Sequence, residues 1–346
     1  PWDHTQTMGP IGVTGAGSTN RLCQETDLII AIGTRLGDFA SGSRSLINPK
    51  AKLLSLNVAS FDAIKHKAVS LVGDAKLTLP LLTEALSDYQ ADGAWIDRAE
   101  TERLAWNKDV DEATRDRGTD LPSDGEVVGA VNRAAGEKDI VVCAAGGLPG
   151  ELQKLWRTRY SRGYHMEYGY SCMGYEIAGG VGTKMAAPDS EVFVMVGDGS
   201  YLMMNSEIAT SVMLGLKVVF VVLDNRGYGC IHRLQQFCGG PGFNNMLEDC
   251  LTVEDGAPKT DFVAHGKALG AKGEKVANIQ ELEAALERAK ASPISYLIEI
   301  DTDPAIVTES GGHWWDVAVP EVSEREQVRD ARKVYEEHKA RQFKNL

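Results

Sequence analysis

Short apolar runs alternate with helical patterns along most of this chain. After Gly125, four such runs lack the polar alternation of half-exposed strands: DIVVC (139–143), EVFVMV (191–196), KVVFVVL (217–223) and ISYLIEI (294–300). Such runs are typical of parallel strands buried on both faces. Apolar residues recur at helical spacing between and around them, at 126–135, 173–186, 201–214, 260–269 and 279–290. The pattern predicts a doubly wound α/β sheet, which binds ligands beyond the carboxyl ends of its strands.

The first part of the chain shows a shorter version of the same pattern. LIIAIG (28–33) and LLSLNV (53–58) predict parallel strands, and 78–86 predicts a helix. We therefore expect a Rossmann-like α/β domain over 1–88, incomplete at its start. Further domain boundaries follow from composition: a charged helical linker at 89–122, a second α/β domain at 123–310, and an extension at 311–346 that ends in a charged helix.

Composition narrows the classes of partner. The 346 residues include 36 Lys and Arg against 49 Asp and Glu, and the net charge of -13 argues against binding to nucleic acid. No apolar run reaches the roughly 20 residues of a membrane span. Six cysteines without a CxxC pair suggest reduced thiols and a cytoplasmic location. Because the chain begins at Pro1, we expect a segment of a longer polypeptide.

The strongest chemical signal is a pair of polar motifs that each follow an apolar strand. Gly197-Asp198-Gly199-Ser200 comes after the run 191–196, and Asp224-Asn225-Arg226-Gly227 comes after 217–223. Asn225 follows Asp198 by 27 positions, which one helix and one strand fill, so both residues reach the same edge of the sheet. A carboxylate, an amide oxygen and a backbone carbonyl suit Mg²⁺. The glycines and the helix that follows them suit a phosphate.

A glycine-flanked aspartate is by itself only a turn between a strand and a helix. The second motif at the matching distance favours the metal and diphosphate site over a plain turn. Another glycine pattern, Gly15-Ala16-Gly17, has no strand before it, and we predict a structural role for it and not a dinucleotide site.

With these two motifs, the chain resembles the thiamine diphosphate enzymes, the family of acetolactate synthase and pyruvate decarboxylase. The resemblance implies a thiamine diphosphate-binding fold at 123–310 and a Rossmann-like middle domain. It also implies thiamine diphosphate and Mg²⁺ as cofactors, with the ion held by Asp198, Asn225 and the carbonyl of Gly227. Cofactor contacts would come from Gly197, Gly199, Ser200, Asn225 and Tyr228.

Two upstream segments also carry the resemblance. In AAGGLPG, the residues Gly146, Gly147 and Leu148 would grip part of the diphosphate. In YGYSCMGYEIAGG, Met173 would wedge between the two cofactor rings, and the carbonyl of Ser171 would accept a hydrogen bond from the aminopyrimidine. Taken alone, Met173 at the start of an apolar helix is equally a core residue.

Candidate catalytic groups precede the wedge. We single out Met173 itself, His165, Glu167 and Tyr170, while noting that His and Tyr side chains are commonly half-buried for structural reasons. The activating glutamate of this family lies in an amino-terminal domain, and we assign it to no residue of this chain. His313, Trp314, Trp315 and Asp316 could cover a substrate, although packing is the more common role of such tryptophans.

Within the family, runs such as AAGGLPGELQKLW and TESGGHWWDVAVPEVS resemble a branch that hydrolyses a cyclic 1,2-dione to a 5-deoxyglucuronate in myo-inositol breakdown. The resemblance implies a small cyclic polyol-dione as substrate and a homodimer or homotetramer, since the family's active site forms between subunits. Two alternatives remain open: a carboligase or 2-oxo acid decarboxylase, and a non-catalytic α/β binding or assembly fragment.

Overall fold

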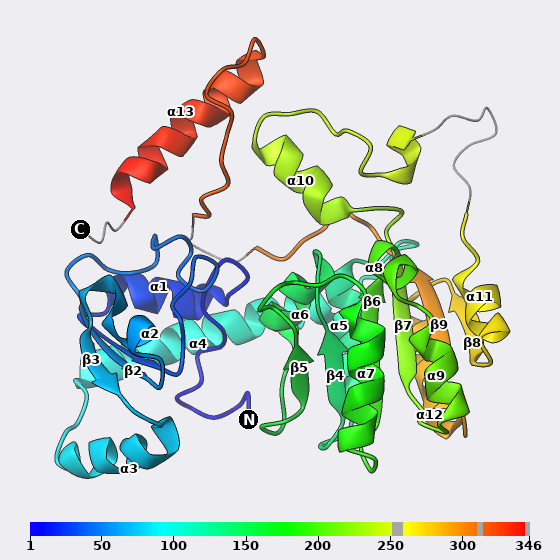
Figure 1. Cartoon of the computed structure of the whole chain (residues 1–346), viewed down its shortest axis with the longest axis horizontal. Coiled ribbons are helices and arrows are strands. Elements are labelled where there is room, and N and C mark those ends of the chain that lie inside the picture. The colour runs from blue at the N-terminus through cyan, green and yellow to red at the C-terminus, as the bar shows by residue number, and fades with distance from the viewer. Residues whose placement is uncertain (251–258, 310–313, 343–346) are drawn as a thin grey trace. The chain divides into compact units, whose positions relative to one another are not determined.

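The computed structural model describes residues 1–250, 259–309 and 314–342, which form two compact units (Figure 1). The larger unit contains residues 1–3 and 109–308, and the smaller contains residues 4–108 and 309–346 as far as they are described. Each unit is built on its own parallel sheet. The chain is therefore an α/β protein with two parallel sheets, as the sequence predicted. The domain boundaries at 88, 122 and 310 stay a prediction.

The larger unit is a six-stranded parallel sheet in the order β5-β4-β6-β7-β9-β8. Its strands are β4 (Ile140–Cys143), β5 (Tyr164–Met166), β6 (Val192–Gly197), β7 (Val219–Asp224), β8 (Lys272–Val276) and β9 (Tyr296–Asp301). Its helices are α5 (Asp124–Ala134), α6 (Leu148–Leu155), α7 (Tyr175–Ala186), α8 (Asp198–Met203), α9 (Glu207–Met213), α10 (Gly229–Phe237), α11 (Phe262–Ala268) and α12 (Ile279–Ala291), with a 3-10 turn at Leu247–Cys250.

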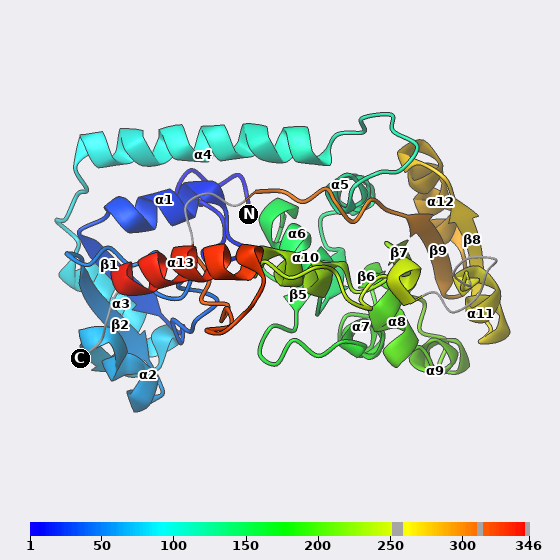
Figure 2. The same cartoon turned by 90° about the horizontal axis from the view of Figure 1, so that it is seen from above.

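Helices cover both faces of this sheet. Figure 2 shows α5, α6 and α12 on one side of the strands and α7, α8 and α9 on the other. The central strands β6 and β7 are buried almost throughout, and alternate residues such as Val194 and Phe220 belong to one hydrophobic core cluster with Ile177 of α7. Burial on both faces explains why these strands carry continuous apolar runs.

In the larger unit, two edge strands escaped the sequence prediction, and one predicted helix is wrong. The strand β5 has only three half-buried residues, and β8 is mostly polar (KGEKV), because edge strands meet the core less fully. The helix expected over 201–214 is two helices, α8 and α9, since Met204 takes a non-helical conformation (φ -155°, ψ 68°) between them. Tyr201 and Ile208 both belong to the hydrophobic core. Because they are spaced as on one face of a helix, the apolar pattern predicted a single unbroken helix.

The smaller unit is a three-stranded parallel sheet in the order β1-β2-β3. Its strands are β1 (Leu28–Ile32), β2 (Lys52–Asn57) and β3 (Val69–Val72). Its helices are α1 (Gly17–Glu25), α2 (Ser60–Ile64), α3 (Ala75–Ala85) and α13 (Glu326–Arg341), with a 3-10 turn at Lys65–Lys67; α4 (Gly93–Thr114) runs from this unit into the larger one. Among the described residues no strand precedes α1, and the structural role expected for the turn at Gly15 stays a prediction.

The carboxyl-terminal tryptophans pack within the smaller unit. Trp314 is buried and stacks on His338 of α13, with 5.6 Å between ring centroids, and Trp315 meets Phe39 edge to face. The packing role predicted for these side chains is confirmed. His313 lies outside the described residues. No helix in the described ranges is both long enough and apolar enough to span a bilayer.

Candidate functional site

The order of the strands creates a ligand crevice in the larger unit. From β4 the chain moves outward to β5 and then returns to β6 on the opposite side of β4. The loops after β4 and β6 therefore diverge at the carboxyl edge of the sheet, which is where open α/β folds bind ligands. Ala144–Gly147 follows β4 and Asp198 follows β6. In Figure 1 this edge lies below α10, at the start of α8.

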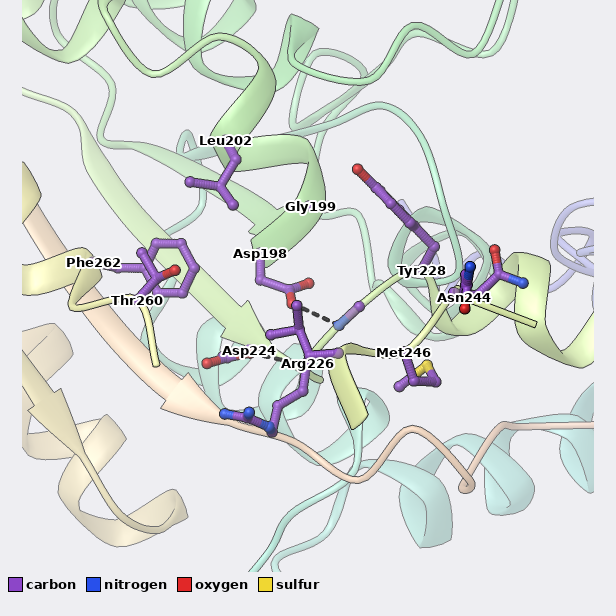
Figure 3. A pocket seen from close by; sticks show the side chains of 13 residues that line it. Asp198, Gly199, Leu202, Asp224, Arg226, Tyr228, Asn244, Met246, Thr260 and Phe262 are labelled. Carbon is purple, nitrogen blue, oxygen red and sulfur yellow. Dashed lines mark hydrogen bonds between the residues drawn. The ribbon is translucent and has the colours of Figure 1, made fainter. Parts of the chain in front are cut away.

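Two carboxylates meet at this edge (Figure 3). Asp198 is 6% exposed, and its Oδ2 accepts a hydrogen bond of 2.8 Å from the backbone N–H of Gly227. Asp224 ends β7 and accepts a hydrogen bond from the backbone N–H of Arg226. Burial and then the neighbouring Asp224 carboxylate raise the pKa of Asp198 to about 7. Because the carboxylates of Asp198 and Asp224 are both buried and interact electrostatically, a bound cation would be favourable between them.

The side chain of Asn225 shows most clearly that these residues suit a cation. Its Oδ1 is buried and finds no hydrogen-bond donor among the described residues. Buried polar atoms are nearly always partnered, so an orphaned amide oxygen in the residue that follows Asp224 suits a hard cation. The residues present therefore fit Mg²⁺: Asp198, Asn225 and the carbonyl of Gly227 would hold it.

The turn that carries Gly227 is shaped by its glycine. Gly227 has φ of +147°, and a Cβ atom there would lie 2.3 Å from the carbonyl oxygen of Asn245. A short antiparallel bridge to Met246 holds the turn in place. Only glycine fits this backbone conformation and this close approach. The turn consequently keeps its backbone beside Asp198.

A cavity of about 190 Å³ opens beside these groups. It is lined by Asp198, Gly199, Leu202, Asp224, Arg226, Gly227, Tyr228, Asn244, Asn245, Met246, Leu247, Thr260 and Phe262. Tyr228 lies across the start of α8, since a Cβ on Gly199 would come within 2.6 Å of its ring. The structure thus brings the predicted residues Asp198, Gly199, Gly227 and Tyr228 to one cavity.

The loop after β4 forms the other side of the crevice. Gly146 has φ of +100° and open space where a Cβ would lie, Gly147 caps α6, and Leu148 begins that helix and is buried. Arg233 of α10 packs against this loop: a Cβ on Gly147 would lie 2.7 Å from Nη2, while Nη1 donates to the carbonyl of Pro304 at 2.8 Å. An open glycine loop beside a guanidinium suits a phosphate group.

Ser200 is engaged by a carboxylate that the sequence analysis did not single out. Its hydroxyl donates to Glu176, 2.8 Å away, and accepts the backbone N–H of Gly174. Glu176 is fully buried, and burial raises the pKa of its carboxyl group. Gly197, which precedes α8, is half-buried with open space where a Cβ would lie.

The segment before α7 holds the predicted catalytic residues in a separate cluster. His165 on β5 hydrogen-bonds through Nε2 to the Tyr175 hydroxyl at 2.7 Å, and the two rings stack. Glu167 accepts the backbone N–H groups of Tyr170 and Cys172, and these bonds lower the pKa of its carboxyl group. The structure thus shows Glu167 as a support of the loop.

Three further predicted residues lie on that segment. Tyr170 is 90% exposed, and Ser171 has a left-handed backbone with φ of 53°. Met173 is half-buried, immediately before Gly174. Neither the ring wedge nor the Ser171 carbonyl contact is tested by these positions, so both stay predictions.

A second acidic group borders the cavity. Asp224, Glu299 and Asp301 bring one carboxylate oxygen each within 4.8 Å of one another. Lys275 contacts both Glu299 and Asp301 at 2.7 Å, which neutralises much of this charge.

Three residues of the site were missed from the sequence: Glu176, Arg233 and Tyr175. A charged residue two positions into an apolar helix was a usable signal for Glu176, because a buried carboxylate needs partners. Arg233 and Tyr175 gave none, since an arginine on a surface helix and a tyrosine at a helix start are common.

Comparison with known proteins agrees with this geometry. Residues 1–82 match the model of the thiamine pyrophosphate enzyme central domain, and residues 144–300 match that of the C-terminal TPP binding domain. The chain is 39% identical to a 3D-(3,5/4)-trihydroxycyclohexane-1,2-dione hydrolase of Geobacillus thermodenitrificans and 36% identical to one of Bacillus subtilis, in both cases over 95% of this chain. A relative from Bacillus licheniformis is 37% identical over 96% of the chain.

The chain spans about half the length of these relatives, 55% of the first two and 56% of the third. Because the central domain and the C-terminal TPP binding domain both match, in this order, the chain belongs to the thiamine pyrophosphate enzyme family.

Proposed function

We propose that this chain binds thiamine diphosphate through Mg²⁺ at the carboxyl edge of its six-stranded sheet. The observation that carries the proposal is the buried, unpartnered Oδ1 of Asn225, two residues before Gly227, whose backbone N–H donates to Asp198. The matching TPP binding domain supports the same cofactor. Bound thiamine diphosphate supplies the electron sink that breaking a carbon-carbon bond next to a carbonyl requires.

The protein's own groups would make an anion-binding site in an acidic chain. Mg²⁺ held by Asp198 and Asn225 would balance the negative charge of the Asp198 and Asp224 carboxylates. Its remaining coordination positions would bind phosphate oxygens. The open backbone at Gly146 and the guanidinium of Arg233 would face the same anion from the other side of the crevice. Local groups would thereby overcome the net charge of -13.

We further propose a cyclic polyol 1,2-dione as substrate and hydrolysis of the bond between its carbonyls as the reaction. The support is the name of the similar hydrolases and the identity along 95% of this chain. The half-buried pair of His165 and Tyr175 could hold or move a proton at the end of β5, because a hydrogen bond of 2.7 Å already joins them. As part of the same proposal, the protein works in the cytoplasm as a homodimer or homotetramer.

Calorimetric titration of thiamine diphosphate into the chain tests the cofactor site. We expect saturable binding with Mg²⁺, no binding with a chelator, and loss of binding in Asn225→Ala. Asp189→Asn, at an exposed position in the turn before β6, is the matched control and should bind as the unaltered chain does. Binding that is independent of Mg²⁺, or retained in Asn225→Ala, would contradict the metal assignment.

The reaction is tested in a fusion of this chain to the part of one of the similar hydrolases that it does not cover, with thiamine diphosphate and Mg²⁺ present. We expect opening of the cyclic dione without release of CO₂ from pyruvate. Release of CO₂ or formation of acetolactate from pyruvate would replace the hydrolase proposal with a decarboxylase or carboligase. Cofactor binding without turnover of either substrate would favour a non-catalytic role.

A further inference from the structure

Glu176 sits where three separate segments of the site converge. Its Oε1 accepts the backbone N–H of Ala145 at 3.2 Å, in the loop after β4. Its Oε2 accepts the backbone N–H of Gly174 at 3.0 Å, directly after Met173. The hydroxyl of Ser200, two residues after Asp198, donates to both oxygens at 2.8 Å. One carboxylate therefore links the loop after β4, the start of α7 and the start of α8.

The chemistry of these contacts requires a carboxylate. Three donors point at the side chain, and an ionised carboxylate is the side chain that only accepts. Glu176 is also in the first turn of α7, where the helix dipole favours negative charge. No cation pairs with it among the described residues, and its exposed fraction is 0%. Burying a carboxylate costs desolvation free energy, and the hydrogen bonds to Glu176 offset this cost. An apolar residue at this position would leave the three donors without this acceptor.

The backbone at Gly174 shows what the contact holds. Gly174 has φ of +92°, and a Cβ there would lie 2.9 Å from the Cβ of Met204. The chain thus turns sharply between Met173 and α7. Both acceptors of the Gly174 N–H, Glu176 and Ser200, fix this turn and with it the direction in which Met173 leaves the backbone.

We infer that Glu176 is a positioning residue that keeps the ring-binding segment at Met173 in register with the phosphate-binding loops at Ala145 and Ser200. This inference rests on the proposed function, because it assumes that one cofactor occupies both parts of the site. Glu176 would act through the three segments that it joins and would not touch the reacting atoms.

The test compares a ligand that uses both parts with one that uses only the phosphate part. In Glu176→Gln, the amide turns a donor toward a donor, so the segments lose their common acceptor while the side-chain volume is kept. With Mg²⁺ present, the Kd of thiamine diphosphate should rise at least about tenfold, and that of inorganic diphosphate by less than about threefold. Glu176→Asp keeps the charge and should recover part of the lost affinity.

Glu126→Gln is the matched control. Glu126 is 1% exposed and also accepts backbone N–H groups and a serine hydroxyl, at the start of α5. Its substitution should lower the unfolding temperature without changing either Kd. Equal weakening of both ligands in Glu176→Gln would reduce Glu176 to a structural role, and unchanged affinities would also overturn the inference. Failure of the unaltered chain to bind thiamine diphosphate would instead overturn the proposed function.

Discussion

Replacing Asp198 by Asn should stabilise the metal-free protein while removing its Mg²⁺-dependent affinity for cofactor. Asp198 is almost fully buried beside Asp224, and both burial and that neighbour disfavour its charged form. The amide keeps the acceptor for the Gly227 N–H, which lies 2.8 Å from Oδ2, and loses the charge. The substitution therefore separates the cost of the charge from the local hydrogen bond.

The magnitude follows from the pKa of Asp198, raised from 3.8 to about 7. The shift is about three units, and at about 1.4 kcal/mol per unit the ionised form costs on the order of 4 kcal/mol in the folded state. Because the folded protein holds the proton more tightly than the unfolded chain, this cost is absent below pH 4. It develops as the pH rises from about 4 to 7 and is complete above 7.

Urea unfolding of both proteins from pH 4 to 9, with a chelator present, measures this difference. The free energy of unfolding of Asp198→Asn should exceed that of the unaltered chain increasingly up to pH 7 and then by a constant amount. Adding Mg²⁺ and thiamine diphosphate at pH 8 should stabilise the unaltered chain alone. Parallel stability profiles of the two proteins across this pH range would refute the reasoning, since no buried charge would then be removed.

Three other substitutions test separate parts of the structure. Gly227→Ala should abolish Mg²⁺-dependent cofactor binding in calorimetry, because its Cβ would meet the Asn245 carbonyl at 2.3 Å; retained binding would show that the turn can move. Arg233→Gln should weaken thiamine diphosphate binding about tenfold at low salt and less at high salt, and an effect independent of salt would argue against a phosphate contact near Gly147. Burial opposes ionisation of Glu126, but its contacts with Arg117 and Ser123 outweigh that effect and lower its pKa to about 2. Ionised Glu126 therefore stabilises the fold above pH 4.5, and this contribution is lost as the pH falls toward 2. Urea titrations of Glu126→Gln should lack this acid-dependent loss of stability, and a profile like that of the unaltered chain would contradict the assignment.

Much of the site could be predicted because its signals are local. A buried strand, the glycine-flanked Asp198 and a helix follow one another directly in the sequence. Asn225 follows the next strand in the same way. In a parallel sheet both strand ends must reach the same edge, so sequence spacing alone brought these residues together. The continuous apolar runs of β6 and β7 likewise followed from burial on both faces.

Other features depend on contacts between segments far apart in the chain. The sequence predicted one helix over 201–214, because Tyr201 and Ile208 share a core-facing period, but packing broke it at Met204. The edge strands β5 and β8 lack an apolar run, and their places in the sheet depend on which neighbours they pair with.

The sequence by itself determined the α/β class, the two motifs and the carboxyl edge at which they meet, because these rest on local periodicity and spacing. Only the tertiary structure decided that Glu176 joins Ala145, Gly174 and Ser200, and that Arg233 lies against Gly147. The physical reason is that a buried charge is tolerated only where donors converge on it, and those donors come from loops that the fold alone brings together.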